Sequence, residues 1–145
     1  MTDLTQRPPR SPRVRLGGFV VLPRILDKCR ATIAGKNGEY NFNCPLDQRF
    51  FGFLQVDAEA FKAEVQKGKG DGEMLAWVLQ NAKAKRSLVE MIVWSKMESK
   101  RVPADVETRE FFQKLHKDAA PNREDIATWF DLLDLDDYVS YGGKA

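Results

Sequence analysis

The sequence has few of the residues that build metal and redox sites. Its 145 residues include one histidine, His116, and two cysteines, Cys29 and Cys44. One histidine excludes a multi-histidine metal site within the chain, and two cysteines cannot complete a four-ligand zinc site or a disulfide framework. No Gly-x-Gly-x-x-Gly, phosphate-loop or nucleophile-elbow motif is present. The sequence therefore predicts free thiols, no metal ion and no cofactor.

Long apolar runs are missing as well. The apolar run Phe19–Leu22 is only four residues long, whereas a membrane span needs about 18 apolar residues. The N-terminus is basic, but this run is too short for the core of a signal peptide, and no small-x-small cleavage site follows it. We therefore expect a cytoplasmic protein that does not enter a membrane.

What is present is typical of a globular protein. Hydrophobic residues make up 43% of the chain and charged residues 30%, which argues against global disorder and favours a single domain over residues 1–145. The net charge of +2 is unevenly distributed. Residues 1–38 carry eight Lys or Arg and two Asp, whereas residues 120–145 carry two basic and six acidic residues. The two ends of the chain therefore have opposite charge.

Residues 1–18 are predicted to form an extended basic arm, because three prolines in this segment remove backbone donors and favour extended backbone. The arginines Arg7, Arg10, Arg13 and Arg15 could bind nucleic-acid phosphates. However, no aromatic residues alternate with them, and no helix is basic along one face, so nucleic acid is an unlikely partner. We favour docking of the arm on the acidic segment Asp131–Asp137.

The rest of the chain predicts helices. Apolar residues recur at helical spacing behind caps such as Asp57 and the Ser87–Glu90 capping box. Leu88–Trp94 is dense in large side chains, which predicts a central, well-covered helix there. The last helix is expected to begin at the cap Asn122 and to present Ile126, Trp129, Phe130 and Leu133.

The fold class is therefore mainly α: a single compact domain of five to seven helices, with at most a short two-stranded β pairing between Phe19–Leu22 and Tyr40–Cys44. Residues 1–18 form the arm, residues 19–133 the helical core, and residues 134–145 an acidic, then Gly-rich tail that frays.

The stretch from Gly38 to Phe53 is the most informative part of the sequence. Alternating apolar residues before Pro45 predict a short extended segment, and Pro45 suits the first position of a helix. Cys44 then becomes the N-cap, and Asp47 the third helical residue. Gly35 and Gly38 bracket a short turn, so this segment must fold back beside the helix that begins at Pro23.

A candidate site follows from this geometry. We expect the start of the Pro45 helix to meet the extended segment and the polar flank of the Pro23 helix. The predicted ligand-binding residues are Cys44, Asp47, Glu39, Tyr40, Arg24 and Asp27. Free backbone N–H groups at a helix start, with an arginine nearby, would suit a small anionic ligand.

The same residues are compatible with other roles. Buried Asp–Arg pairs that tie the helices together would look identical in sequence, and Cys44 could be a structural cap. A Cys44–His116 dyad is disfavoured because nothing in the sequence aligns two residues 72 positions apart. We favour a non-catalytic binding or interaction module with a small anionic ligand or a protein partner, and assign no catalytic residue. The alternative is a small enzyme or redox protein that uses the Cys44 thiol with nearby carboxylates.

Several motifs together resemble a bacterial family known as domain of unknown function 5069. These motifs are Arg7-Pro-Pro-Arg-Ser-Pro-Arg, Leu16-Gly-Gly-Phe, Leu22-Pro-Arg-Ile-Leu-Asp-Lys, Gly38-Glu-Tyr and Cys44-Pro-Leu-Asp. The likeness continues through Phe50–Phe61 and more loosely to Trp77 and Trp129, whereas residues 83–120 do not match. The resemblance implies a small cytoplasmic protein and carries no activity with it. Cys29 departs from the family pattern, in which alanine is expected there, and this weakens any mechanism that needs two thiols.

Overall fold

The computed structural model describes residues 3–145 of the chain. Within this range it contains seven helices and one two-stranded antiparallel sheet in a single compact domain, as the sequence predicted. The elements in chain order are β1 (Arg15–Leu16), β2 (Phe19–Val20), α1 (Leu22–Ile33), α2 (Pro45–Leu54), α3 (Ala58–Gln66), α4 (Asp71–Asn81), α5 (Leu88–Ser99), α6 (Val106–Ala119) and α7 (Trp129–Ser140).

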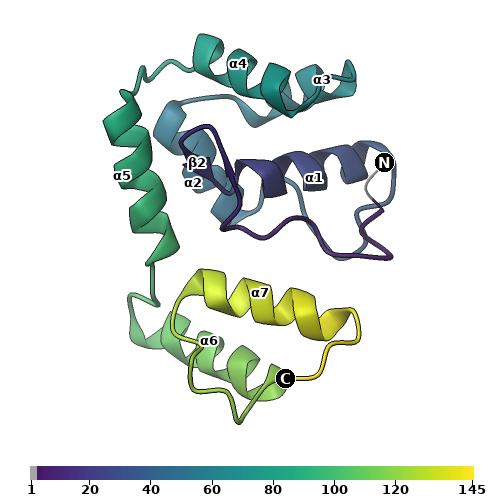
Figure 1. The fold of residues 1–145 in the computed structure, drawn as a ribbon, viewed down its shortest axis with the longest axis vertical. Coiled ribbons are helices and arrows are strands. Elements are labelled where there is room, and N and C mark those ends of the chain that lie inside the picture. The colour runs from purple at the N-terminus through teal and green to yellow at the C-terminus, as the bar shows by residue number, and fades with distance from the viewer. Residues whose placement is uncertain (1–2) are drawn as a thin grey trace.

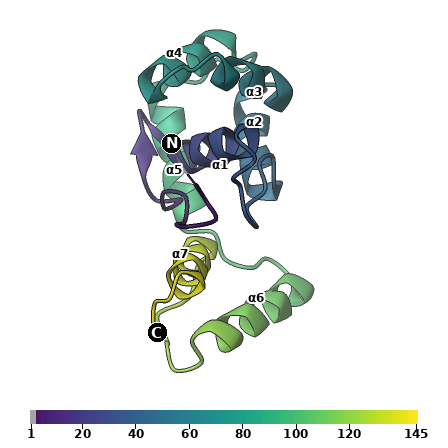
Figure 2. The same ribbon diagram turned by 90° about the vertical axis from the view of Figure 1, so that its right-hand side faces the viewer.

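The elements form two groups in space. The arm, the sheet and α1 to α5 make an N-terminal body, and α6 and α7 form a C-terminal hairpin below it (Figures 1 and 2). There are two apolar cores: one in the N-terminal body, to which α7 contributes Phe130, and one within the hairpin. None of the helices in residues 3–145 is long and apolar enough to cross a membrane.

Helix α1 is the centre of the N-terminal body. Its residues from Leu22 to Cys29 are all buried, including Arg24, Asp27 and Lys28. We expected these three polar residues to lie on the flank of the helix, and the arm, α2 and α7 instead enclose them. Burial of so many charged groups requires partners from those elements. Helix α1 is therefore the element that the arm, α2 and α7 all contact through buried charges.

An aromatic cluster joins β2, α2 and α3. Phe50 lies with its ring centroid 5.2 Å from Phe19 and 5.6 Å from Phe51, in edge-to-face geometry. Phe51 in turn contacts Phe61 on α3 at 5.1 Å. Aromatic pairs in such geometry contribute about 0.5–1.5 kcal/mol each beyond the burial of their apolar area. This cluster fixes the position of α2, and hence of the residues at its start.

The predicted helix starts are largely confirmed. Pro45 is the first residue of α2 with Cys44 as its N-cap, and Asp57 caps α3 through its side chain. Ser87 and Glu90 form the expected capping box of α5. At α4 the N-cap is Gly70.

Helix α5 differs from the prediction of a well-covered helix. Met91, Trp94, Ser95 and Glu98 are buried, but the opposite face is open. Val89 and Val93 are 69% and 60% exposed, and Leu88, Ile92 and Met97 are also exposed. The density of apolar residues predicted burial on all sides, whereas α5 lies at the edge of the body (Figure 1).

The last helix begins later and ends later than predicted. It starts at Trp129 behind the N-cap Thr128, whose capping box includes Asp131, so Asn122 is not its cap. It continues to Ser140, so residues 134–140 are helical and do not belong to a frayed tail. The physical reason is the second core, in which Leu132 and Leu135 pack with Phe112 of α6.

The β pairing is confirmed in kind but not in partners. β2 pairs with β1 across a tight turn at Gly17, whose φ of 60° suits glycine. Residues 40–44 form no strand; Asn43 there has a φ of 61°, which breaks the expected extended segment.

Candidate functional site

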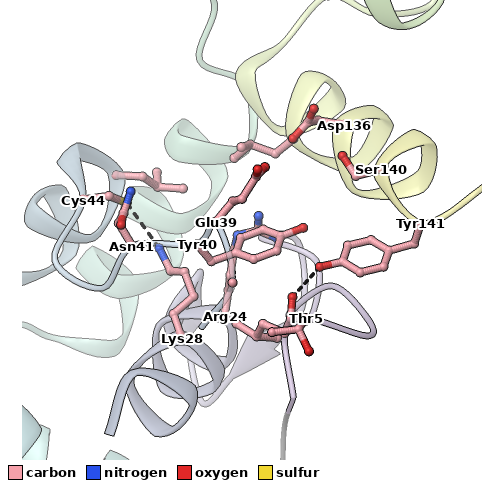
Figure 3. A pocket seen from close by; sticks show the side chains of 14 residues that line it. Thr5, Arg24, Lys28, Glu39, Tyr40, Asn41, Cys44, Asp136, Ser140 and Tyr141 are labelled. Carbon is pink, nitrogen blue, oxygen red and sulfur yellow. Dashed lines mark hydrogen bonds between the residues drawn. The ribbon is translucent and has the colours of Figure 1, made fainter. Parts of the chain in front are cut away.

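A pocket of about 520 Å³ lies between the arm, α1, the segment that leads into α2, and the end of α7 (Figure 3). Four of the six residues predicted for the site line it: Arg24, Glu39, Tyr40 and Cys44. Gly38 lets the arm approach, because a Cβ at this position would meet the Leu4 carbonyl oxygen at 2.8 Å. The pocket volume is in the range of known small-molecule sites.

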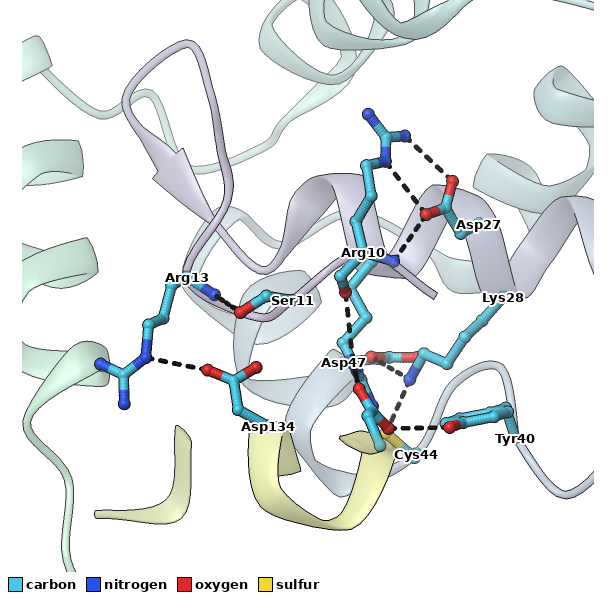
Figure 4. Close-up of polar contacts among 11 residues, drawn as sticks. Arg10, Ser11, Arg13, Asp27, Lys28, Tyr40, Cys44, Asp47 and Asp134 are labelled. Carbon is cyan, nitrogen blue, oxygen red and sulfur yellow. Dashed lines mark hydrogen bonds and ion pairs between the residues drawn. The ribbon is translucent and has the colours of Figure 1, made fainter. Parts of the chain in front are cut away.

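The Cys44 side of the pocket is built on a buried ion pair. Lys28 Nζ donates to Asp47 Oδ1 at 2.8 Å and to Cys44 Sγ at 3.2 Å (Figure 4). Lys28 and Asp47 are 4% and 0% exposed at their side chains. Asp47 Oδ2 also accepts from the Asn43 backbone N–H at 2.9 Å, which holds the left-handed turn before α2. Asp47 therefore lies behind the pocket wall and orients Lys28.

A second buried network forms the floor of the pocket and links it to α7. Arg24 Nη1 donates to Asp137 Oδ2 at 2.7 Å, and the Tyr40 hydroxyl donates to Asp137 Oδ1 at 2.7 Å. The guanidinium of Arg24 also lies 5.5 Å from the centroid of the Tyr40 ring. Burial and the Asp137 carboxylate raise the pKa of Tyr40, so its hydroxyl keeps its proton and remains the donor.

Asp27 does not join the site. Its carboxylate accepts from the backbone N–H of Arg10 at 2.9 Å and from Arg10 Nε at 3.0 Å (Figure 4). Arg10 also donates to Asp71 of α4 at 2.8 Å. Asp27 therefore fastens the arm to the body on a different side of α1. Arg13 pairs with Asp131 and Asp134 of α7, so this part of the arm does dock on the acidic segment.

The pocket has two carboxylates that no cation neutralises. Glu39 and Asp136 line it, and neither makes an ion pair or a side-chain hydrogen bond within residues 3–145. Loss of hydration and then repulsion by Asp137 raise the pKa of Asp136; the charge of Arg24 opposes this rise, and Glu39 adds a smaller repulsion. By contrast, both cations of the lining, Arg24 and Lys28, are already paired with buried carboxylates. Glu39 and Asp136 are exposed to solvent and have no ion-pair partner in the part of the chain that the structure describes, so the charge that the protein leaves unpaired in this pocket is negative.

Sequence reasoning missed several residues of the site. Asp136, Asp137, Ser140 and Tyr141 were assigned to a fraying tail, because the last helix was expected to end near Leu133. The Tyr141 hydroxyl donates to the Leu4 carbonyl at 2.5 Å and closes one end of the pocket. The polar residues at the end of α7 were the one sequence feature that could have indicated a role for this segment. Lys28 was missed because a lysine on a helix flank is usually solvated.

No group of three or more His, Cys, Asp or Glu residues able to hold a metal ion occurs in the described part of the chain. The two cysteines are unpaired: Cys29 is buried in the body and Cys44 is partly exposed. Burial raises the pKa of Cys29 to about 12, so its thiol stays protonated at neutral pH. Only Cys44 offers a sulfur atom to the pocket.

The chain belongs to the family described as Domain of unknown function (DUF5069), whose model matches residues 6–139. The match covers the arm, the N-terminal body and the C-terminal hairpin up to the last turn of α7. It thus includes the segment from residue 83 to 120 that the motifs alone left unmatched. A comparison with curated proteins found no match.

Proposed function

We propose that the protein is a non-catalytic binding module whose pocket takes a small organic cation. The observation that carries this proposal is the pair of unneutralised carboxylates, Glu39 and Asp136, in a cavity of about 520 Å³. An ammonium group between them would relieve the repulsion that contributes to the raised pKa of Asp136. Tyr40 and Tyr141 add aromatic surface to the same cavity, which favours organic cations.

The small anionic ligand expected from the sequence has weaker support. An anion would need Arg24 or Lys28 to leave a buried carboxylate, and a buried carboxylate without its partner is costly. The backbone N–H groups at the start of α2 are also less available, because Pro45 has none and the Asp47 carboxylate lies beside them. We therefore propose the same site with a positively charged ligand in place of an anion.

Compartment and source are part of the proposal. The free thiols of Cys29 and Cys44 support a reducing, cytoplasmic location. The motif resemblance from the sequence supports a bacterial source.

Calorimetric titration with 1,4-diaminobutane, spermidine and choline tests the ligand class, with inorganic phosphate as the anionic comparison. We expect at least one amine to bind and phosphate not to bind. Glu39→Gln and Asp136→Asn should each weaken amine binding about tenfold, as loss of a charge-assisted hydrogen bond does. Glu110→Gln, an exposed carboxylate on α6, is the matched control and should change nothing. Phosphate binding without amine binding would restore the anionic hypothesis.

The contact between Lys28 and Cys44 keeps a second candidate open, a small enzyme or redox protein that uses this thiol. Ammonium groups accompany reactive thiolates in many enzymes. Here Asp47 binds the same ammonium and offsets its charge, so the contact alone does not select the thiolate. Iodoacetamide labelling at pH 6 distinguishes the two candidates. Alkylation of Cys44 much faster than that of an exposed peptide thiol would favour the enzyme. We expect slow labelling at Cys44 and none at Cys29.

A further inference from the structure

A second cavity of about 420 Å³ is lined by residues of α2 and α7 and by Arg101. It is lined by Pro45, Leu46, Arg49, Arg101, Trp129 and Leu133. Leu46 and Leu133 line the first pocket as well, so the two cavities are neighbours along these helices. Four of the six lining residues are apolar or aromatic, and the other two are arginines.

The charges of this cavity are opposite in sign to those of the first pocket. Glu98 is fully buried and receives Arg49 Nη2 at 2.7 Å and Arg49 Nε at 3.0 Å. Arg101 Nε lies 3.6 Å from the same carboxylate. One carboxylate thus serves two guanidinium groups, and one positive charge remains uncompensated.

Arg101 has a buried donor that makes no hydrogen bond within the described residues. Its Nη1 is the one buried side-chain nitrogen or oxygen in residues 3–145 without a hydrogen-bond partner. Burial and then repulsion by Arg49 lower the pKa of Arg101, and the attraction of Glu98 offsets only part of this effect. A buried donor without a hydrogen-bond acceptor costs about 1–3 kcal/mol. A ligand that supplies the acceptor would recover this free energy. The side chain is 27% exposed and already lines the cavity.

We propose that this cavity binds a singly charged carboxylate with an apolar body. The carboxylate is held by Arg101 and Arg49, and the apolar body lies against Trp129, Leu46 and Leu133. The planar fork of an arginine matches a carboxylate, and the remaining single charge suits one negative group better than a dianion. The surrounding apolar walls give such a ligand area to bury that inorganic anions lack.

Titration with 3-phenylpropionate, followed by the indole N–H signals in two-dimensional NMR, tests this site. The chain has three tryptophans, and Trp129→Phe identifies the signal that belongs to the cavity. We expect saturable movement of the Trp129 signal, with those of Trp77 and Trp94 unchanged. The neutral isostere 3-phenylpropanamide should bind about tenfold more weakly, because it lacks the charge.

Two substitutions separate this site from a generic apolar contact. Arg101→Met should reduce 3-phenylpropionate affinity about tenfold, and Arg15→Met, an exposed arginine of β1, should not. Glu98→Gln should tighten binding, because it frees both guanidinium groups; this variant decides the matter if Arg101→Met does not fold. Equal affinity for acid and amide, or weaker binding in Glu98→Gln, would overturn the proposal. Glu39→Gln in the first pocket should leave this titration unchanged, so the two sites succeed or fail separately.

Discussion

Lys28 and Asp47 form a buried ion pair. Both are removed from water, and an isolated charge in such a place is strongly destabilising. The pair is tolerated because polar partners replace the lost water. Lys28 and Asp47 share a 2.8 Å hydrogen bond, Lys28 also contacts the Cys44 sulfur, and Asp47 accepts from the Asn43 backbone N–H. A polar residue on α1 thereby fixes the cap of α2.

Removal of one partner should therefore be severe. We predict that Lys28→Met lowers the free energy of unfolding by about 3–5 kcal/mol, because the Asp47 carboxylate stays buried without its cation. The double variant Lys28→Met/Asp47→Asn should recover at least half of this loss, since asparagine still accepts from Asn43 and carries no charge. Urea denaturation monitored by circular dichroism measures both. A loss below about 1 kcal/mol in the single variant would show that the pair is more hydrated than its burial indicates.

At the scale of elements, helix α5 presents adjacent residues in opposite environments. Trp94 is 6% exposed, with its ring 6.1 Å from Phe50, whereas Val93 is 60% exposed. We predict that Trp94→Ala costs about 3–5 kcal/mol, whereas Val93→Ser changes stability by no more than about 0.5 kcal/mol. Thermal unfolding at low protein concentration provides the comparison. A large cost for Val93→Ser would mean that another surface covers this face in solution.

The elements also show where sequence reasoning succeeds and fails. The starts of α2, α3 and α5 were predictable because proline and capping side chains act within four residues of sequence. The covered face of α5 was not, because its apolar residues lie on all sides and only the tertiary fold selects one. The start of α7 was missed for a related reason. Asn122 and Thr128 are both competent caps, and the contact of Leu132 with the second core decides between them.

The link between the arm and α4 gives stability a dependence on pH. Hydrogen bonds from Arg10, and then from Arg30, hold the pKa of Asp71 below its ordinary value of 3.8. The folded state thus binds this proton less tightly than the unfolded chain does. The contribution of Asp71 is complete above the unfolded pKa and is lost as the pH falls through the folded pKa. We predict that Asp71→Asn is less stable than the wild type at pH 7, and that the difference shrinks steadily below about pH 4. Equal differences at pH 7 and pH 2.5 in urea denaturation would contradict this.

At the scale of the whole molecule, the C-terminal hairpin is joined to the body by polar contacts and by Phe130 of α7, which is buried in the first core. The candidate pocket (Figure 3) and the Arg101 cavity are both lined by residues of α7 and of the N-terminal body. Four of the six predicted site residues line the first pocket because they belong to segments that are close in sequence. Asp136 and Asp137 could not be placed from sequence, since nothing local shows that α7 returns to α1 more than a hundred residues after it.

The Asp137 network is the part of this junction that should control how firmly the hairpin is held. Asp137 is 9% exposed at its side chain and accepts from both Arg24 and Tyr40. We predict that Asp137→Asn leaves Arg24 buried without a counter-charge and lowers the stability of the junction by about 3–5 kcal/mol. Leu132 and Leu135 of α7 pack in the second core, and Phe130 is the buried α7 residue of the first core. Amides of α7 should therefore lose hydrogen-exchange protection by two orders of magnitude or more, while those of α1 lose less. Asp134→Asn, which removes a partly exposed pair with Arg13, is the matched control and should change exchange in α7 only slightly. A uniform loss of protection over both cores in Asp137→Asn would instead mean that body and hairpin unfold as one cooperative unit, and that the polar junction is as strong as the cores it connects.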